Sequence, residues 1–403
     1  MYQLLNGLSL IEASSFVASP TAGLYCAQMG ADVVRVDQIG GGPDFRRWPV
    51  TNTNASLYWE NLNRSKKSVA LDLSVPQGRE LLQELVRATG QFITNFPAEG
   101  FLSHAKLAEG KADLVTVRVM GWADGSPALD YTVNNAVGYP MMTGAGMEPV
   151  NHTLPAWDLL SGAYAAFALL AALQRRTATG EGSEVRIPLS DVAIGTVANL
   201  GGIAEMLYSG TNRPRLGNTV YGLFGRDFVT RDGQRTMVVV VTPRQWAKLL
   251  DALDLTASVA AIEHVRGVSF AHDDGLRFTH RDALFPLFEA AVASRDHAEL
   301  AAGFDAAGIV HSAYRSMLDA AHDPRLVGNN PMFSALDTNP SGFDYPAAGA
   351  FATVPQQIRG KPRPAPLNGQ HSEQVLSERL KLSSGEIARL VDAGVVGVAK
   401  RTS

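Results

Sequence analysis

The chain is poor in cysteine and has no long apolar run. Its 403 residues include a single cysteine, Cys26, so an intramolecular disulfide is excluded and a cysteine-based zinc site is not expected. Cys26 stands in an apolar stretch, which favours a small buried side chain over a nucleophile. The longest apolar run, residues 163–173, is too short to span a bilayer. No basic segment followed by an apolar one opens the chain, so we expect no signal peptide, no membrane partner and a cytoplasmic protein.

Neither sign of charge is in large excess. Lysine and arginine number 35 against 39 aspartates and glutamates, and the net charge of −4 gives no broad basic surface for nucleic acid. An anionic ligand group would therefore need local cations. Two clusters provide them, Arg46-Arg47 and Arg64-Ser65-Lys66-Lys67, each next to a predicted strand. Taken alone, each cluster is most simply interpreted as solvated surface.

Several common site motifs are also missing. The turn after the first predicted strand, residues 14–20, contains no glycine, so it lacks the close backbone approach that a dinucleotide pyrophosphate needs. No Walker sequence, His-Glu-x-x-His or Gly-x-Ser-x-Gly occurs. The nine histidines are scattered, and His272-Asp273-Asp274 is typical of a solvated turn. We therefore expect no metal site and no tightly bound cofactor.

Strand and helix patterns alternate through the first half of the chain. Strands are predicted near residues 8–13, 31–37, 69–73, 91–95, 113–117 and 183–189, with helices at 20–29, 79–87, 156–176 and 192–208. Strands separated by helices are typical of βαβ units. The pattern predicts an α/β fold with a Rossmann-like large domain and a parallel sheet.

The pattern changes after about residue 225. Two β-type runs flank Asp232-Gly233, which predicts a hairpin, and helices follow to about residue 325, so a smaller α+β domain is expected. Residues 331–366 are rich in proline and glycine and are typical of a connecting arm. The predicted division is a large domain at 1–200, a linker at 201–225, a small domain at 226–328, and an arm with the C-terminal part of the large domain at 329–403.

Asp158 stands at the start of the alanine-rich helix predicted at 156–176. An acidic residue there commonly does no more than stabilise the helix by about 1 kcal/mol, and composition alone favours that interpretation. The same helix N-terminus would keep the carboxyl ionised and ready to act as a nucleophile. The small residues that follow, Gly162, Ala163, Ala165 and Ala166, would let another backbone or a long ligand lie close.

Several motifs, taken in order, resemble the class III CoA-transferases. They are residues 7–12 with 30–37, 62–73, 94–97, Asp158 with its apolar helix and residues 176–182, and residues 365–376. The similarity runs almost from end to end. The resemblance implies a large domain built from both ends of the chain, a small domain between them, and two subunits that interlock as rings in a homodimer. It also implies acyl-CoA and carboxylate substrates, with coenzyme A as part of the substrate.

The resemblance assigns roles by position. Asp158 corresponds to the nucleophile, which works through a mixed anhydride and an aspartyl-CoA thioester. The positions where family members contact CoA are Val17, Ala18, Leu71, Asp72, Leu73, Ser74, Asn95, Phe96 and Pro97. We add Arg46 and Lys66 as candidate phosphate partners, and the amides near Val17 and Ala18 as candidates for stabilising oxyanions. Residues 217–225 stand where the family has a glycine-rich lid, with fewer glycines here.

Further motifs narrow the reaction. Residues 40–50, 130–134, 151–158 and 221–228 resemble family members that move CoA between the C1 and C4 carboxyls of mesaconate. Candidates for contacting such a diacid are Arg47, Asp130, Tyr131, His152 and Arg226, and for Arg47, His152 and Arg226 a structural salt bridge is an equal alternative. CoA transfer between separate acids, an α-methylacyl-CoA racemase and a non-catalytic acyl-CoA binder remain alternatives. Leu129 occupies the position of the racemase histidine, which disfavours that branch.

Overall fold

The computed structural model describes residues 1–336 and 338–399. The chain forms two compact units. The first contains Met1–Val137, His152–Ser209 and Pro324–Ser403, and the second contains Gly138–Asn151 and Gly210–Asp323. The last four residues of the C-terminal part predicted at 329–403 lie outside the described residues.

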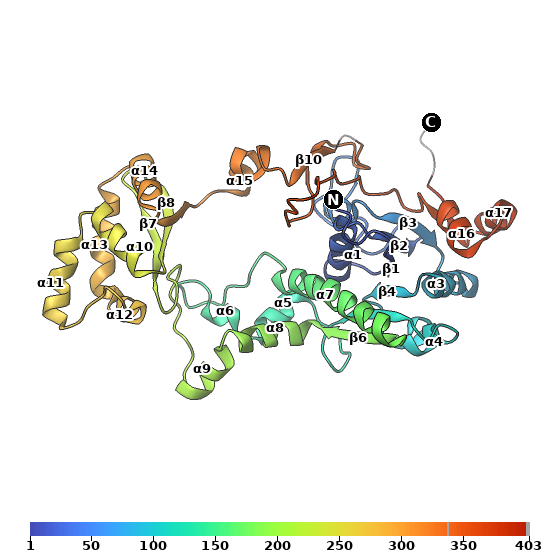
Figure 1. Cartoon of the computed structure of the whole chain (residues 1–403), viewed down its shortest axis with the longest axis horizontal. Coiled ribbons are helices and arrows are strands. Elements are labelled where there is room, and N and C mark those ends of the chain that lie inside the picture. Colours follow the sequence, from blue (N-terminus) through green and yellow to red (C-terminus); the bar gives the residue numbers. More distant parts are fainter. Residues whose placement is uncertain (337, 400–403) are drawn as a thin grey trace. The chain divides into compact units, whose positions relative to one another are not determined.

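A seven-stranded sheet organises the first unit (Figure 1). Its order is β12-β3-β2-β1-β4-β5-β6, and all neighbours are parallel except β12 and β3. The strands are β1 (Ser9–Ala13), β2 (Asp32–Gln38), β3 (Lys67–Leu71), β4 (Gln91–Thr94), β5 (Val115–Met120), β6 (Ser183–Pro188) and β12 (Val396–Gly397). The predicted α/β fold with a parallel-dominated sheet is confirmed.

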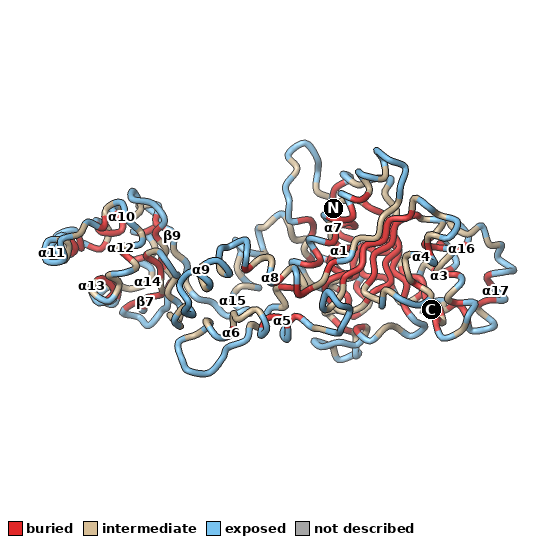
Figure 2. The backbone as a smooth tube through the Cα atoms, turned by 90° about the horizontal axis from the view of Figure 1, so that it is seen from below, coloured by how far each residue is buried: buried red, intermediate tan, exposed pale blue. Residues whose placement is uncertain are grey.

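Helices cover both faces of this sheet, which is why its strands are continuous apolar runs. Leu10, Val33 and Val117 pack on one face under α1 (Ala18–Gln28) and α7 (Ala156–Thr179). Ile11 and Val69 pack on the other face with α3 (Pro76–Thr89), α4 (His104–Ala108), α16 (Ser372–Leu380) and α17 (Ser384–Asp392). Figure 2 shows the strands as the most continuously buried part of this unit.

The sheet order reverses direction between β1 and β4. From β1 the chain builds β2 and β3 on one side, and β4, β5 and β6 on the other. At such a switch point the loops after two neighbouring strands turn away from each other and leave a crevice, where ligands of open α/β sheets bind. The loops after β1, β4 and β5 are therefore the expected place for a site.

Helix α7 lies close against α1 through a glycine. A Cβ added to Gly162 would stand 2.6 Å from the carbonyl oxygen of Ala18 and 2.7 Å from Cβ of Thr21. The expectation that small residues let another backbone approach is thus confirmed, with α1 as that backbone. By length and hydropathy α7 could also cross a membrane, yet it packs on α1, β5 and β6 like the core helix of a globular unit.

The remaining elements complete the two units. The first unit also has α2 (Leu57–Asn63), α5 (Asp130–Ala136), α8 (Leu189–Asn199), α9 (Gly202–Ser209) and the pair β10 (Phe333–Leu336) and β11 (Tyr345–Ala348). The single helix predicted at 192–208 is wrong, because Gly201 adopts a left-handed φ of 79° and separates α8 from α9.

The second unit is built on a small antiparallel sheet. Its strands β7 (Phe224–Val229), β8 (Arg235–Val240) and β9 (Val310–Ala313) pair in that order, and β7 and β8 form the predicted hairpin. Its helices are α6 (Tyr139–Met142), α10 (Pro243–Ala252), α11 (Thr256–Arg266), α12 (Asp274–Thr279), α13 (Arg281–Ala293), α14 (His297–Ala307) and α15 (Met317–His322).

Candidate active site

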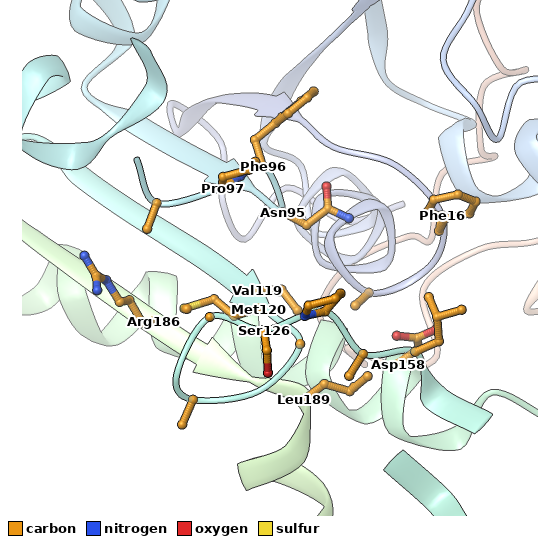
Figure 3. Close-up of a pocket in the computed structure, with 18 of the residues that line it drawn as sticks. Phe16, Asn95, Phe96, Pro97, Val119, Met120, Ser126, Asp158, Arg186 and Leu189 are labelled. Carbon is orange, nitrogen blue, oxygen red and sulfur yellow. The ribbon is translucent and has the colours of Figure 1, made fainter. Parts of the chain in front are cut away.

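Asp158 lines a cavity of about 650 Å³ at the switch point of the sheet. The cavity is bounded by the loops after β1, β4 and β5 and by the first turn of α7 (Figure 3). Its lining includes five of the residues predicted to contact CoA, namely Val17, Ala18, Asn95, Phe96 and Pro97. The structure therefore brings the candidate nucleophile and one group of candidate CoA contacts together.

The Asp158 carboxyl has no hydrogen-bond donor among the described residues. Burial, and then the Asp130 carboxylate, raise its pKa to about 7, although the Arg47 guanidinium acts in the opposite direction. Burial and Asp130 therefore oppose the ionisation that the helix N-terminus is expected to favour. Near neutral pH the group populates both forms, and the ionised form is a carboxylate on the cavity wall, available for attack.

Asp130 occupies the N-terminus of α7, next to Asp158. The Oδ2 atom of Asp130 accepts hydrogen bonds from the backbone N–H groups of Trp157 at 2.7 Å and Asp158 at 3.0 Å. Its Oδ1 atom lies 2.5 Å from Nε2 of His152. The first N–H groups of a helix are its anion-binding groups, and here Asp130 occupies two of them.

These contacts place the predicted substrate residues Asp130, Tyr131 and His152 in one cluster. Asp130 is buried, and its carboxylate is committed to the start of α7 and to His152. The Tyr131 hydroxyl donates to the carbonyl of Thr153 at 3.3 Å, and its ring stands edge-on to His152. The cluster orients the first turn of α7, and with it Asp158.

The turn between β1 and α1 is fixed from two sides. Asn95 Oδ1 accepts from the Ser15 N–H at 3.1 Å, and Asn95 Nδ2 donates to the Ser15 carbonyl at 2.9 Å. Asp44 Oδ2 accepts from the Phe16 N–H at 2.9 Å and holds Phe16 at a left-handed φ of 67°. This turn delivers Val17 and the first N–H groups of α1 to the cavity wall.

The other predicted CoA contacts lie at the end of β3. Leu71 and Leu73 are buried in the core under α3, and Asp72 accepts hydrogen bonds from the Ser74 N–H and hydroxyl. None of these four is among the residues that line the Asp158 cavity in the described part of the chain. They occupy the same carboxyl-terminal edge of the sheet, beyond β2 and β1.

The predicted cations have different surroundings. Lys66 is buried, and its ammonium donates to Glu12 at 2.8 Å, Asn63 at 2.8 Å and the Pro20 carbonyl at 2.9 Å. Burial lowers the pKa of Lys66 to about 8 against the opposing effect of Glu12. A phosphate role would require these contacts to break, because all three ammonium hydrogens already have acceptors.

Arg46 is exposed and lines a separate cavity of about 340 Å³ with Phe45 and Trp59. Arg226 lies in the second unit on β7, where it pairs with Glu289 at 2.7 Å and packs over the ring of Phe285 at 4.8 Å. These contacts match the salt-bridge alternative for Arg226.

Sequence reasoning missed one cation of the cavity. Arg186, on β6, lines the same cavity as Asp158 and pairs with Glu184 at 2.8 Å. Its side chain is about half exposed, so it is accessible to an anionic ligand group. Its place in the second half of β6 was a usable signal, because this strand ends on the same edge of the sheet.

Comparisons with known proteins agree with this geometry. Residues 5–372 match the model of CoA-transferase family III. The chain belongs to this family. It is 43% identical over 414 aligned residues, covering all of both chains, to 2-methylfumaryl-CoA isomerase of Chloroflexus aurantiacus. It is 24% identical to succinyl-CoA:glutarate CoA-transferase of Mus musculus, over 97% of this chain and 90% of that one.

The fold has solved counterparts. A crystal structure of a CAIB/BAIF family protein from Brucella suis superposes with a TM-score of 0.75 at 23% identity, covering 94% of this chain and 100% of that one. The family model and the relative of 43% identity confirm the family predicted from the ordered motifs. They also confirm the similarity to an enzyme of mesaconyl-CoA, since mesaconate is 2-methylfumarate.

Proposed function

We propose that this protein moves CoA within one molecule, between the C1 and C4 carboxyls of mesaconate. The identity of 43% along the whole chain to 2-methylfumaryl-CoA isomerase supports the substrate. The observation that carries the chemistry is Asp158, a carboxyl on the cavity wall that lacks a hydrogen-bond donor among the described residues. A carboxylate without donors keeps its electron pairs available for attack on a thioester carbonyl.

The reaction proceeds in four transfers. An oxygen of Asp158 attacks the C1 thioester carbonyl and expels CoA thiolate, which leaves a mixed anhydride. The thiolate attacks the Asp158 carbonyl, releasing mesaconate and forming an aspartyl-CoA thioester. The C4 carboxylate attacks that thioester and expels the thiolate again. The thiolate then attacks the C4 carbonyl, which gives the C4 thioester and regenerates Asp158.

The cavity wall offers groups for each stage. The N–H groups at the start of α1, near Val17 and Ala18, are our candidates for stabilising the oxyanions, because they carry the positive end of that helix. Asn95, Phe96 and Pro97 are proposed to contact CoA, with residues 71–74 further along the same sheet edge. We also propose Arg186 as a phosphate partner. Coenzyme A acts as part of the substrate.

We further propose a homodimer, which the family resemblance implies as interlocked rings. Helix α7 leaves Leu160, Tyr164, Phe167 and Leu170 between 39% and 64% exposed. These residues recur every three or four positions, so they form one apolar stripe on the helix, a surface suited to a second copy. Light scattering of the purified protein at micromolar concentration should give twice the 43.0 kDa chain mass.

The reaction test needs mesaconyl-C1-CoA as the sole substrate. Chromatography of the C1 and C4 thioesters should show conversion without an added acceptor, and Asp158→Ala should abolish it. Isotopically labelled free mesaconate, added during turnover, should stay out of the product. Label uptake would favour transfer between separate acids, and absence of conversion would reject the mesaconate assignment.

A further inference from the structure

Two polar side chains beside Asp158 lack partners in the described part of the chain. The hydroxyl of Tyr58, on α2, is buried without a hydrogen bond. The Arg47 guanidinium forms neither an ion pair nor a hydrogen bond there, and it lies over the ring of Tyr58 at 5.1 Å and the ring of Phe16 at 5.5 Å. Arg47 is an exposed residue, so its guanidinium is open to a ligand from solvent. The Tyr58 hydroxyl is buried, and buried polar groups in native proteins are nearly always satisfied, so this orphaned donor points to a missing acceptor.

Both groups belong to the surroundings of the nucleophile. Phe16, which Arg47 covers, lines the same cavity as Asp158 (Figure 3). Burial raises the pKa of Tyr58 to about 12, with Arg47 lowering it and Asp158 raising it, so the phenol remains a donor at neutral pH. An arginine and a tyrosine donor without acceptors, next to a carboxyl nucleophile, suit a second anion.

We propose that Arg47 and Tyr58 form a subsite for the idle carboxylate of the substrate, meaning the carboxylate not bonded to CoA or Asp158. This inference rests on the proposed function. Guanidinium groups bind carboxylates through two parallel hydrogen bonds, and a phenol can donate a third. Because C1 and C4 exchange roles during the reaction, one subsite serves both halves, with C4 bound first and C1 bound after mesaconate turns.

The subsite makes the enzyme selective for diacids, which a substrate pair can test. Tiglyl-CoA has the carbon skeleton of mesaconyl-C1-CoA with a methyl group in place of the free carboxylate. Attack by Asp158 on tiglyl-CoA should expel CoA thiolate and form a mixed anhydride. Return of the thiolate to the Asp158 carbonyl should then release tiglate and leave aspartyl-CoA, which intact-protein mass spectrometry detects. The rate of that adduct's formation is measured in single turnovers for both thioesters.

For the wild-type enzyme, the second-order rate constant of adduct formation should be about 100-fold lower with tiglyl-CoA than with mesaconyl-C1-CoA. The rates are compared at pH 9, because Arg47 lowers the pKa of Asp158, which is about 7, and its loss would otherwise reduce the ionised fraction of the nucleophile. At that pH, Arg47→Gln should lower the mesaconyl-C1-CoA rate by about 100-fold and change the tiglyl-CoA rate by less than about threefold. Tyr58→Phe should lower the mesaconyl-C1-CoA rate by about tenfold and leave the tiglyl-CoA rate nearly unchanged. Arg175→Gln is the control, because Arg175 is exposed and pairs with Glu181 at the other end of α7.

The outcomes separate the inference from the proposed function. If Arg47→Gln lowers the rates with both thioesters equally, the subsite is overturned, because Arg47 would then act on Asp158 or on the fold and not on the free carboxylate. No loss with either would overturn it as well, and circular dichroism identifies variants that fail to fold. If the wild-type enzyme forms no adduct with either thioester, the proposed function itself fails. Partial recovery in Arg47→Lys would support a charge-based role.

Discussion

Replacing Asp130 with asparagine should make Asp158 more acidic. Asparagine keeps a carbonyl oxygen for the N–H groups of Trp157 and Asp158 but removes the negative charge that opposes the ionisation of Asp158. With a pKa of about 7, Asp158 is about one-tenth ionised at pH 6 and nine-tenths ionised at pH 8. The wild-type kcat/KM should therefore rise about tenfold over that interval.

Removal of a neighbouring negative charge lowers the pKa of a carboxyl group by about one unit. In the Asp130→Asn variant, Asp158 should then be about half ionised at pH 6. The kcat/KM of this variant should therefore be about fivefold above that of wild type at pH 6 and nearly equal to it at pH 8. The assay is the initial rate of mesaconyl-C1-CoA conversion from pH 5.5 to 9. Asp191→Asn, an exposed first-turn acid of α8, serves as the control. An unshifted or raised apparent pKa in Asp130→Asn would refute the electrostatic explanation.

Three further changes test the site and its supports. Because the folded-state pKa of Asp158 is raised, the wild-type protein loses stability as the pH rises from about 4 to 7. The free energy of unfolding of Asp158→Asn relative to wild type should therefore increase by about 2 kcal/mol between pH 5 and pH 8, as measured by thermal unfolding. Lys66→Met should cost about 3 kcal/mol and leave the KM for the thioester unchanged, whereas a phosphate role would raise KM. Gly162→Ala should cost about 2 kcal/mol and lower kcat, since its Cβ would collide with α1, and kcat equal to wild type would contradict this.

The sheet was predictable from local signals, and Asp158 could be named as the candidate nucleophile from the order of the family motifs. Apolar residues recur every second position in strands and every three or four positions in helices, so each segment carries its own pattern. Asp158 stands in the first turn of a long apolar helix, and the ordered family motifs around it, not its local pattern, made it the candidate nucleophile. The strand β12 left no such signal, since it has two residues and joins the sheet only through its pairing with β3. The break between α8 and α9 depends on one glycine within an otherwise apolar pattern.

The electrostatics of the site could not be predicted, because they depend on distant pairs. Asp130 reaches the N–H group of Asp158 across 28 residues of sequence, and Lys66 meets Glu12 across 54. In sequence both look like ordinary polar positions. Tyr58 carries no motif, and its orphaned hydroxyl becomes visible only when α2, Arg47 and Asp158 are seen together.

The central claim, that Asp158 carries CoA during turnover, is tested most directly by rapid acid quench and peptide mapping. Wild-type enzyme is mixed with mesaconyl-C1-CoA, quenched within one turnover and digested, and the peptide containing Asp158 is examined by mass spectrometry. The account predicts a CoA thioester on Asp158 that forms before the C4 thioester appears and disappears as that product accumulates. Conversion of C1 to C4 thioester by Asp158→Ala, or an adduct located on another residue, would contradict it.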